Sequence, residues 1–367
     1  MKALTILGGG NTAFAVAANL ALHDFEITLC EHPNFATALD PIRASSKIKL
    51  IGVAEQGVAK IHQITDDIAV ALRNDLILLI VPAYAHKPFA EWCAPYLRDG
   101  HVIVMTPGTL GALAFGQIVR QSGNQSKIAF AETDTAPYVC RKTAPDTATI
   151  WGVVSGLGLG VYPATQTEQV ADALQAIFTV NGHSGTASAI SPYPNVLACG
   201  LSAMNPVVHP PGVLMNAGRV EYSRGEFYFY EEGVTPTVAQ VIYAVDGERR
   251  AIGKALGFEL TPVDAAFHAA GFGPKGDLWA TINGSRMLTQ LRAPGAVNTR
   301  WLTEDIPYGL AAWSRLADQL GVATPTMKAL VTLASAALQQ DFWQMARTPE
   351  QLGLAGMDKF AMLDYVA

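Results

Sequence analysis

One histidine, His209, has a setting that suits proton transfer. It follows the apolar pair Val207 and Val208 and precedes Pro210 and Pro211. Proline fixes its own φ angle and restricts the residue before it, so the backbone here has little freedom. An unperturbed imidazole titrates at about pH 6.5, which suits a group that gains and loses a proton near neutral pH. The alternative is a core histidine whose ring is held by backbone hydrogen bonds.

A polar segment further along the chain, residues 298–309, contains Arg300 and Asp305. Arginine is the side chain best shaped to hold a carboxylate through two parallel hydrogen bonds. Asp305 lies just ahead of Ile306 and Pro307, where a helix is expected to begin, so it is either a helix N-cap or a functional carboxylate. Arg300 is either a surface charge or an anion-binding residue. The local pattern leaves both pairs of alternatives open.

The N-terminus carries a pattern typical of dinucleotide binding. Residues 3–7 form an apolar run that predicts a strand, and the segment after it matches the fingerprint GxGxxG/A. Gly8 permits a tight turn, Gly10 lets a pyrophosphate approach the backbone, and Ala13 lets the next helix pack closely on the strand. Phosphate would bind the free N–H groups at the start of that helix. The predicted phosphate-binding residues are Gly8, Gly10, Asn11, Thr12 and Ala13.

An acidic residue bears on the choice of cofactor. Glu31 ends the second expected strand, residues 26–30. A carboxylate there accepts hydrogen bonds from the adenosine ribose and repels a 2′-phosphate, which favours NAD over NADP. His32 and Arg43 are close in sequence and leave NADP open. The alternatives are an ordinary exposed carboxylate at a strand end and a glycine-rich turn that has lost its ligand.

Two further loops are expected at the carboxyl ends of strands, where ligands bind in open α/β sheets. Pro82 ends the continuous apolar run 76–81, a pattern typical of a strand buried on both faces of a parallel sheet. His86 follows and is either a residue beside the nicotinamide or an exposed histidine at a helix start. Pro107 lies in the second loop, after a strand expected over residues 101–105. We include Pro82, His86 and Pro107 among the predicted cofactor-binding residues.

The order of the expected elements predicts the fold class. Strands over residues 3–7, 26–30, 76–81, 101–105 and 127–131 alternate with helical patterns. This alternation indicates right-handed βαβ units and a Rossmann-like, doubly wound sheet. Beyond about residue 185 the alternation fades, and helical patterns begin at Thr235-Pro236, Ile306-Pro307 and Thr324-Pro325.

We therefore predict an α/β N-terminal domain followed by a mainly α-helical C-terminal domain. The first, residues 1–185, would bind NAD(P), and the second, residues 186–367, would bind substrate and carry catalysis. The boundary is expected within residues 181–185. Gly257 and Gly321 are expected to end the first two C-terminal helices, and the third is expected to reach about Leu338.

Several blocks of the chain resemble the opine dehydrogenases, the octopine/nopaline dehydrogenase family. The blocks are GGGN (8–11), AETDTAPYVCR (131–141), NPVVH (205–209), NAG (216–218), FYFYEEGVTP (227–236), DGER (246–249), TEDIPYGL (303–310) and RTPEQLGL (347–354). They extend over nearly the whole chain, and several are specific, although many dehydrogenases share the first. The glycine turn departs from the family in having Thr12-Ala13 where many members carry a second glycine pair.

The resemblance implies an NAD(P)-dependent oxidoreductase acting on CH–NH donors. It would condense a 2-oxo acid, such as pyruvate, with the amino group of an amino acid, and also catalyse the reverse oxidation. His209 matches the family's catalytic histidine, Asp305 its partner carboxylate, and Arg300 a substrate-binding arginine. Weaker candidates for the substrate pocket, each with packing as the alternative, are Cys140, Arg141, Asn205 and Trp279.

The chemistry of that reaction gives each of the three side chains a task. The amine must lose a proton and the carbonyl oxygen must gain protons to leave as water, so one group that cycles a proton serves both steps. A carboxylate bonded to the far imidazole nitrogen fixes the tautomer and stabilises the imidazolium. An arginine would anchor the oxo acid and align its carbonyl carbon with the nicotinamide. Asp305 is therefore expected within hydrogen-bond distance of the His209 ring, at the mouth of the nicotinamide cleft.

Two other functions stay open. A related two-domain dehydrogenase acting on a 2-hydroxy acid, ketopantoate or a polyol phosphate would turn over an oxo acid without any amine. A non-catalytic sensor that keeps the dinucleotide fold would bind NADH without turnover. A sensor has no need of the intact set of His209, Arg300 and Asp305, which argues against it.

Composition narrows the partners and the location. The 367 residues are 50% hydrophobic and only 15% charged, and the net charge of −6 argues against nucleic acid or an anionic membrane as the main partner. Four cysteines without CxxC spacing predict reduced thiols in a cytoplasmic protein, with no metal site. Neither a signal peptide nor the run of ~20 apolar residues needed for a membrane span is recognisable. The substrate amino acid and the oligomeric state, a homodimer included, stay open.

Overall fold

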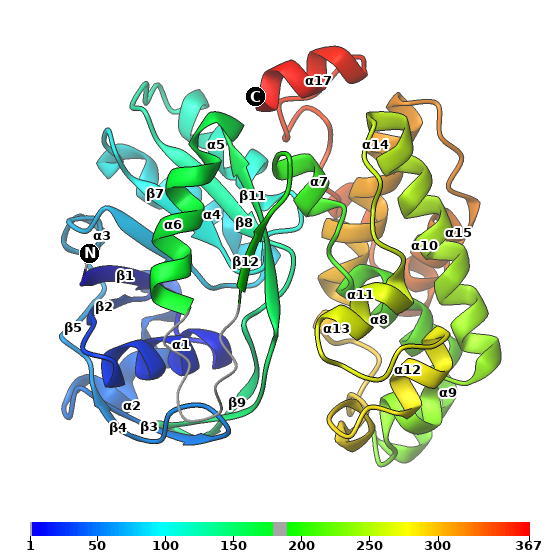
Figure 1. Ribbon diagram of the computed structural model, residues 1–367, viewed down its shortest axis with the longest axis horizontal. Coiled ribbons are helices and arrows are strands. Elements are labelled where there is room, and N and C mark those ends of the chain that lie inside the picture. The colour runs from blue at the N-terminus through cyan, green and yellow to red at the C-terminus, as the bar shows by residue number, and fades with distance from the viewer. Residues whose placement is uncertain (1, 179–188) are drawn as a thin grey trace. The chain divides into compact units, whose positions relative to one another are not determined.

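A computed structural model describes residues 2–178 and 189–367, which divide into two compact units (Figure 1). Unit 1 comprises Met1–Gly200 and Val366–Ala367, and unit 2 comprises Leu201–Tyr365. Residues 181–185, where the sequence places the domain boundary, lie outside the described residues.

A mostly parallel sheet forms the centre of unit 1. In spatial order its strands are β12 (Ala189–Pro192), β11 (Gly156–Tyr162), β8 (Ala129–Thr133), β7 (Val102–Met105), β6 (Leu76–Leu79), β1 (Ala3–Leu7), β2 (Glu26–Cys30) and β5 (Gln63–Thr65). Neighbours from β8 to β5 are parallel, and β11 runs antiparallel to β8. The chain order reverses between β1 and β6, as in doubly wound dinucleotide-binding sheets. The predicted Rossmann-like sheet and its five predicted strands are confirmed.

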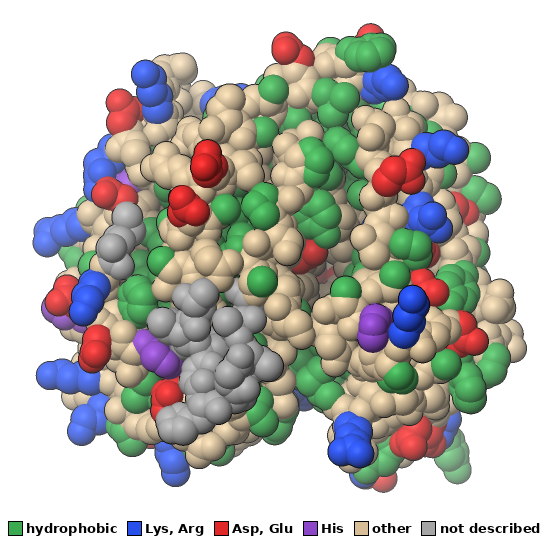
Figure 2. All heavy atoms as spheres, viewed as in Figure 1, with side chains coloured by type: hydrophobic (Ala, Val, Ile, Leu, Met, Phe, Trp, Pro, Cys, Tyr) green, Lys and Arg blue, Asp and Glu red, His purple; other side chains and the backbone are tan. Residues whose placement is uncertain are grey.

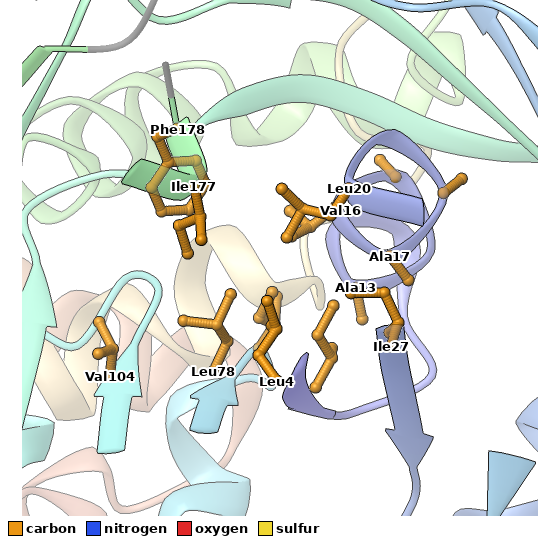
Figure 3. Packing of buried hydrophobic residues seen from close by; sticks show 14 of the residues in the cluster. Leu4, Ala13, Val16, Ala17, Leu20, Ile27, Leu78, Val104, Ile177 and Phe178 are labelled. Atoms are coloured by element: carbon orange, nitrogen blue, oxygen red, sulfur yellow. The ribbon is translucent and has the colours of Figure 1, made fainter. Parts of the chain in front are cut away.

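The central strands are apolar because helices cover the sheet. Every residue of β6 and β7 is buried. Helix α1 (Asn11–Leu22) packs Ala13, Val16, Ala17 and Leu20 into the same cluster as Leu4, Ile27 and Leu78 of the sheet, and Ile177 and Phe178 of α6 (Thr167–Phe178) complete it (Figure 3). Each large side chain buried in this way contributes roughly 1.5–3 kcal/mol to folding. This packing fixes α1, and with it the glycine turn that precedes the helix.

A second, four-stranded sheet in unit 1 is not predicted from the sequence. Its order is β4 (Gly57–Lys60), β3 (Lys47–Gly52), β10 (Thr147–Val153) and β9 (Tyr138–Ala144). Strand β3 alternates buried and exposed residues instead of forming a continuous apolar run, which is the weaker signal of a half-covered strand. Strand β9 contacts α1, so residues 138–144 lie beside the start of that helix.

Unit 2 is built from helices (Figure 1). They are α8 (Asn205–Met215), α9 (Ala217–Ser223), α10 (Pro236–Leu256), α11 (Val263–Ala269), α12 (Leu278–Asn283), α13 (Arg300–Thr303), α14 (Ala312–Gln319), α15 (Pro325–Leu338), α16 (Phe342–Met345) and α17 (Lys359–Val366), whose last residue falls in unit 1. The Thr235 hydroxyl accepts a hydrogen bond from the Val238 N–H, and Gly257 ends α10 with φ +92°. The predicted bounds of α10 and α15 are therefore confirmed.

The helix predicted to begin at Ile306 takes a different form. Residues Ile306–Ala311 form a short π-helical segment, η7, and α14 follows it directly. A second π-helical segment, η5, spans Phe229–Gly233. Single-turn π segments occur frequently at functional sites because they redirect side chains that a regular helix would place elsewhere. Both segments border His209, which contacts Tyr230 of η5 and Asp305 at the start of η7.

Among the described residues, no helix is long and apolar enough to cross a membrane, and no three His, Cys, Asp or Glu side chains are grouped as a metal site would require. The four cysteines are unpaired. Acidic and basic side chains are interspersed on the face drawn in Figure 2, as expected for a modest net charge.

Candidate active site

The glycine turn of unit 1 joins β1 to α1. Gly8 has φ +123°, and a Cβ there would lie 2.4 Å from the carbonyl oxygen of Ile80, so only glycine fits. Gly10 is different, because a Cβ at this position would meet nothing within 4 Å. The protein's own packing does not require glycine there, whereas the close approach of a pyrophosphate would. Gly10 is also the N-cap of α1 and has no side chain to cap its free N–H groups.

Glu31 lies at the end of β2 and faces this turn. Its carboxylate accepts hydrogen bonds from the backbone N–H of Gly9, at 2.6 Å, and of His32, at 2.8 Å. Burial raises the pKa of Glu31, and the two backbone hydrogen bonds and Lys142 counteract part of that rise. The alternative of an ordinary exposed carboxylate is therefore wrong, since Glu31 is buried at the turn.

Lys142 is a charged residue at this turn that sequence reasoning missed. It belongs to β9, and its Nζ lies 3.5 Å from the carbonyl oxygen of Gly9 and 3.4 Å from that of Ala38. Its backbone N–H donates to the side-chain oxygen of Asn11 at 2.9 Å. Only the unpredicted second sheet brings this lysine to the turn, so no local signal in the sequence marks it.

The loops after β6 and β7 lie at the same edge of the sheet as Gly8. Pro82 precedes a short 3₁₀ turn, and His86 is the first residue of α4 (His86–Cys93). His86 is buried, and a Cβ on Gly111 would lie 2.4 Å from its Nδ1, so the alternative of an exposed histidine at a helix start is wrong. The roles of Pro82, His86 and Pro107 in cofactor binding stay predictions.

The loop that contains Pro107 is strained and held by a buried carboxylate. Thr109 and Leu110 have φ +51° and +65°, which is uncommon for residues with a Cβ and recurs at functional sites. The Glu132 carboxylate accepts hydrogen bonds from the N–H groups of Leu110, at 2.7 Å, and Ala112, at 2.9 Å. Glu132 therefore fills the N-terminus of α5 (Gly111–Gln121) and fixes this loop.

In unit 2, His209 lies within α8, which continues through the two prolines that follow it. Pro210 and Pro211 have no N–H, so α8 loses two backbone hydrogen bonds, and an interior proline costs roughly 3 kcal/mol or more. Two glycines let neighbouring segments pack closely onto α8, and this packing offsets part of the cost of the prolines. A Cβ on Gly309 would lie 2.4 Å from Pro206, and one on Gly212 would lie 2.4 Å from the Phe229 ring. The π-helical segments η7 and η5 therefore pack directly onto the histidine helix.

Asp305 bonds to the histidine ring and not to the helix that it precedes. Its Oδ2 lies 2.8 Å from Nδ1 of His209, 96 positions away in sequence, and its side chain makes no N-cap hydrogen bond. The alternative of an N-cap carboxylate is therefore wrong, and the predicted hydrogen-bond distance is confirmed. Both side chains are about nine-tenths buried, with 12% of each exposed. The pair is therefore largely screened from water, although a small part of each side chain is exposed.

Two aromatic residues around His209 were not predicted. The Trp301 ring stacks on the imidazole, with centroids 4.3 Å apart and planes 5° apart, and Trp301 and Phe229 meet edge to face with centroids 4.6 Å apart. The Tyr230 hydroxyl lies 3.2 Å from Nε2 of His209. Trp301 stands between two predicted residues, and Tyr230 lies in a block that carries the family resemblance, but neither position indicates a contact with His209.

The remaining predicted substrate residues belong to several elements of the chain. Arg300, at the start of α13, is 61% exposed and lies 3.7 Å from Glu304, so its guanidinium is accessible to a carboxylate ligand. Asn205 and Trp279 are exposed on α8 and α12. Cys140 and Arg141 belong to β9 of unit 1.

Cys140 borders the glycine turn. Its thiol lies 3.8 Å from the Thr12 hydroxyl, and burial raises its pKa to about 11. The thiol therefore keeps its proton near neutral pH and is a poor nucleophile. Substrate binding by Cys140, Arg141, Asn205 and Trp279 stays a prediction.

Comparison with known proteins places the chain in a family. The model for the NAD/NADP octopine/nopaline dehydrogenase alpha-helical domain matches residues 192–338. An opine dehydrogenase of Arthrobacter sp. (strain 1C) is 31% identical over 362 residues, which cover 97% of this chain and 96% of the relative. The chain belongs to the opine dehydrogenase family. Members of this family are NAD(P)-dependent oxidoreductases that act on CH–NH donors.

More distant opine dehydrogenases share the same architecture. Vitopine synthase of Allorhizobium ampelinum is 25% identical and matches over 99% of both chains. The structure of an octopine dehydrogenase with NADH and L-arginine has a TM-score of 0.78 at 21% identity and covers 100% of this chain and 98% of its own. A ketopantoate reductase from Ralstonia eutropha JMP134 reaches 0.58 at 18% identity and covers 93% of this chain and 99% of its own. Sequence identity thus supports opine dehydrogenase activity over the ketopantoate alternative, with which only the fold is shared.

Proposed function

We propose that this opine dehydrogenase joins the amino group of an amino acid to a 2-oxo acid, with His209 as the proton-transfer residue. The observation that carries the proposal is the 2.8 Å hydrogen bond between His209 and Asp305. This pair occurs in a chain whose glycine turn leaves open space at Gly10. The same groups would serve the reverse oxidation of an opine.

The glycine turn fits a dinucleotide. Gly10 leaves room for the pyrophosphate, and the N–H groups at the start of α1, near Asn11 and Thr12, would bind it. Glu31 would accept hydrogen bonds from the adenosine ribose, which favours NAD, while Lys142 adds a positive charge that leaves NADP open. When bound, the reduced nicotinamide supplies the hydride that reduces the C=N bond.

His209 would act first as a base and then as an acid. Because the Asp305 carboxylate accepts from the Nδ1–H, Nε2 carries the lone pair that can take a proton from the substrate ammonium group. Asp305 then stabilises the imidazolium. The imidazolium returns this proton to the oxygen of the former carbonyl group, and a second proton follows the same route from the nitrogen. The C–O bond then breaks, which releases water and leaves the C=N bond. Positioned acid–base catalysis of this kind contributes roughly 10²–10⁴-fold to the rate.

Arg300 would bind the carboxylate of the 2-oxo acid. It is exposed, and its contact with Glu304 is long at 3.7 Å, so little interaction energy is lost when a substrate carboxylate replaces Glu304 as its partner. A two-pronged arginine contact would fix the oxo acid and orient its carbonyl carbon. Pyruvate is the first candidate, since a solved octopine dehydrogenase has been captured with NADH and pyruvate.

The proposal is tested by following NADH oxidation with pyruvate or 2-oxoglutarate against each of the twenty amino acids. We expect oxidation only when an oxo acid and an amino acid are both present. Oxidation with an oxo acid alone would point to a dehydrogenase of the 2-hydroxy acid type, and NADH binding without turnover on any pair would point to a sensor. A cytoplasmic location and a homodimer stay predictions, which fractionation and sedimentation would test.

A further inference from the structure

Both ring nitrogens of His209 have hydrogen-bond partners. Nδ1 lies 2.8 Å from Asp305, and Nε2 lies 3.2 Å from the Tyr230 hydroxyl. In the neutral ring the Asp305 carboxylate can only accept, so Nδ1 carries the proton and Nε2 carries the lone pair. The Tyr230 O–H is therefore the donor to Nε2, the same nitrogen that must take the substrate proton.

Packing, and not the hydroxyl alone, holds Tyr230 in this position. The residue belongs to the π-helical segment η5 and is 6% exposed. Its ring meets Phe229 edge to face, with centroids 5.1 Å apart, and Phe229 in turn fits over Gly212 of the histidine helix. Removing the hydroxyl would leave these apolar contacts intact.

The Tyr230 hydroxyl also keeps its own proton. Burial raises the pKa of Tyr230 above its usual value of 10, and the nearby charge of Asp305 raises it further. The side chain is therefore a neutral phenol over the whole range in which an imidazole titrates. A phenol both donates and accepts hydrogen bonds, whereas a carboxylate at the same place would only accept.

We infer that Tyr230 is a positioning residue for His209, an inference that rests on the proposed function. Its hydroxyl donates to Nε2 while the ring is neutral and accepts from the Nε2–H after the ring has taken the substrate proton. In the first transfer an amine N–H bond breaks and an Nε2–H bond forms. In the second that Nε2–H bond breaks and an O–H bond forms on the former carbonyl oxygen. This pair of transfers occurs twice, because the oxygen needs two protons from the nitrogen before the C–O bond breaks and water leaves. Tyr230 exchanges no proton in either step.

This arrangement gives Tyr230 a task that Asp305 and Trp301 do not perform. Asp305 selects the tautomer through Nδ1, and Trp301 covers a face of the ring. Tyr230 contacts Nε2, the nitrogen that reacts. A substrate proton that reaches Nε2 therefore arrives beside the Tyr230 hydroxyl, whose hydrogen bond must reverse its direction.

The test compares Tyr230→Phe with Tyr228→Phe in the full-length chain. Tyr228 lies two residues away, and its ring packs against the guanidinium of Arg292, so it controls for loss of a hydroxyl in the same segment. We expect Tyr230→Phe to lower kcat about tenfold or more while the KM of each substrate changes less than about threefold. Tyr228→Phe should match the wild type in both constants.

A double-mutant cycle separates action through His209 from a general structural effect. If Tyr230 acts through the histidine, Tyr230→Phe should cost nothing further in a His209→Gln background. Independent losses that multiply would overturn the inference. If His209→Gln abolishes turnover and Tyr230→Phe keeps the wild-type kcat, the inference about Tyr230 fails while the proposed function stands. If no pair of substrates is turned over by the wild type, the proposed function itself fails.

Nitrogen-15 spectra of histidine-labelled protein supply a measurement that needs no active variant. At a pH where the imidazole is neutral, the His209 signal, assigned with His209→Gln, should show Nδ1 protonated and Nε2 as a hydrogen-bonded acceptor. The Nε2 resonance should move in Tyr230→Phe and stay unchanged in Tyr228→Phe. A wild-type spectrum with Nε2 protonated would overturn the inference, even if Tyr230→Phe failed to fold.

Discussion

The glycine turn of unit 1 and the histidine site of unit 2 are built in opposite ways. The turn is formed by the backbone of one short stretch, and it depends on the lack of a Cβ atom at Gly8 and Gly10. The histidine site uses side-chain atoms from α8, η5 and the segment around Asp305, and its central contact joins residues 96 positions apart. We therefore expect the glycine turn to lose its function when a methyl group is added, and the histidine site when a single hydrogen-bonding group is replaced.

Among the changes that keep His209, the largest expected effect is that of Asp305→Asn, which changes one atom of the histidine site. The amide NH₂ can donate to Nδ1, which would place the ring proton on Nε2 and remove the base. By analogy with catalytic histidine–aspartate pairs we expect kcat to fall by roughly 10³–10⁴-fold. Steady-state kinetics measures this, with the exposed Asp318→Asn as the control. Wild-type turnover in Asp305→Asn would show that the pair has only a structural role.

Adding one methyl group at Gly8 or at Gly10 should distinguish an effect on stability from an effect on NADH binding. In Gly8→Ala the new Cβ would clash with the carbonyl oxygen of Ile80, and the φ of +123° is unfavourable, so the free energy of unfolding should fall by at least about 1–3 kcal/mol. In Gly10→Ala the methyl has room, so stability should change by less than about 0.5 kcal/mol. The Kd for NADH should nevertheless rise about tenfold or more, because the methyl occupies the space for the pyrophosphate.

Denaturant titration and fluorescence titration with NADH measure these two quantities. Unchanged NADH affinity in Gly10→Ala would contradict the assignment of the turn to the cofactor. Equal destabilisation by both substitutions would contradict the distinction drawn between the two glycines.

Arg300→Ala should affect binding and not the proton transfer itself. A hydrogen bond to a charged group contributes about 1.5–3 kcal/mol, so the KM for the 2-oxo acid should rise roughly 10- to 100-fold. Stability should hardly change, because Arg300 is 61% exposed and makes only a long contact with Glu304. The matched control is Lys328→Ala, an exposed cation paired with Asp318. A change confined to kcat would instead place Arg300 in the chemical step.

The smallest expected effect concerns the pH dependence of NADH binding. Burial raises the pKa of Glu31, and ribose hydroxyls donate to its ionised form. NADH affinity should therefore rise as the pH increases through this raised pKa, by a few-fold at most. Fluorescence titrations between pH 5 and 8 should show the rise in the wild type and in Glu26→Gln, an exposed control on the same strand, and should not show it in Glu31→Gln. A rise that persists in Glu31→Gln would assign the pH dependence to another group.

The same contrast explains what the sequence could predict of the fold. The strand at Leu76–Leu79 was predictable because a strand buried on both faces is apolar at every position. Helix α10 was predictable because Thr235 and Gly257 act locally at its two ends. The second sheet was not predictable, because strands such as β3 are short and only half buried. The π-helical form of residues 306–311 depends on Gly309 meeting Pro206 of another helix, which no local pattern encodes.

The functional residues also fall into those that the sequence predicts and those that it does not. Gly8 and Gly10 follow from a motif whose geometry is local, whereas the contact of His209 with Asp305 was expected from the family resemblance and the chemistry together. Tyr230 and Trp301 were missed because their rings meet His209 only after η5 and α13 have packed onto α8. Lys142 was missed because an unpredicted sheet delivers it to the glycine turn.

We propose that His209 of unit 2 carries out the proton transfer while unit 1 binds the cofactor. The most direct test measures turnover and NADH affinity together in His209→Gln. The expected result is a loss of at least roughly 100-fold in kcat with an unchanged Kd for NADH. Turnover close to that of the wild type would contradict the claim.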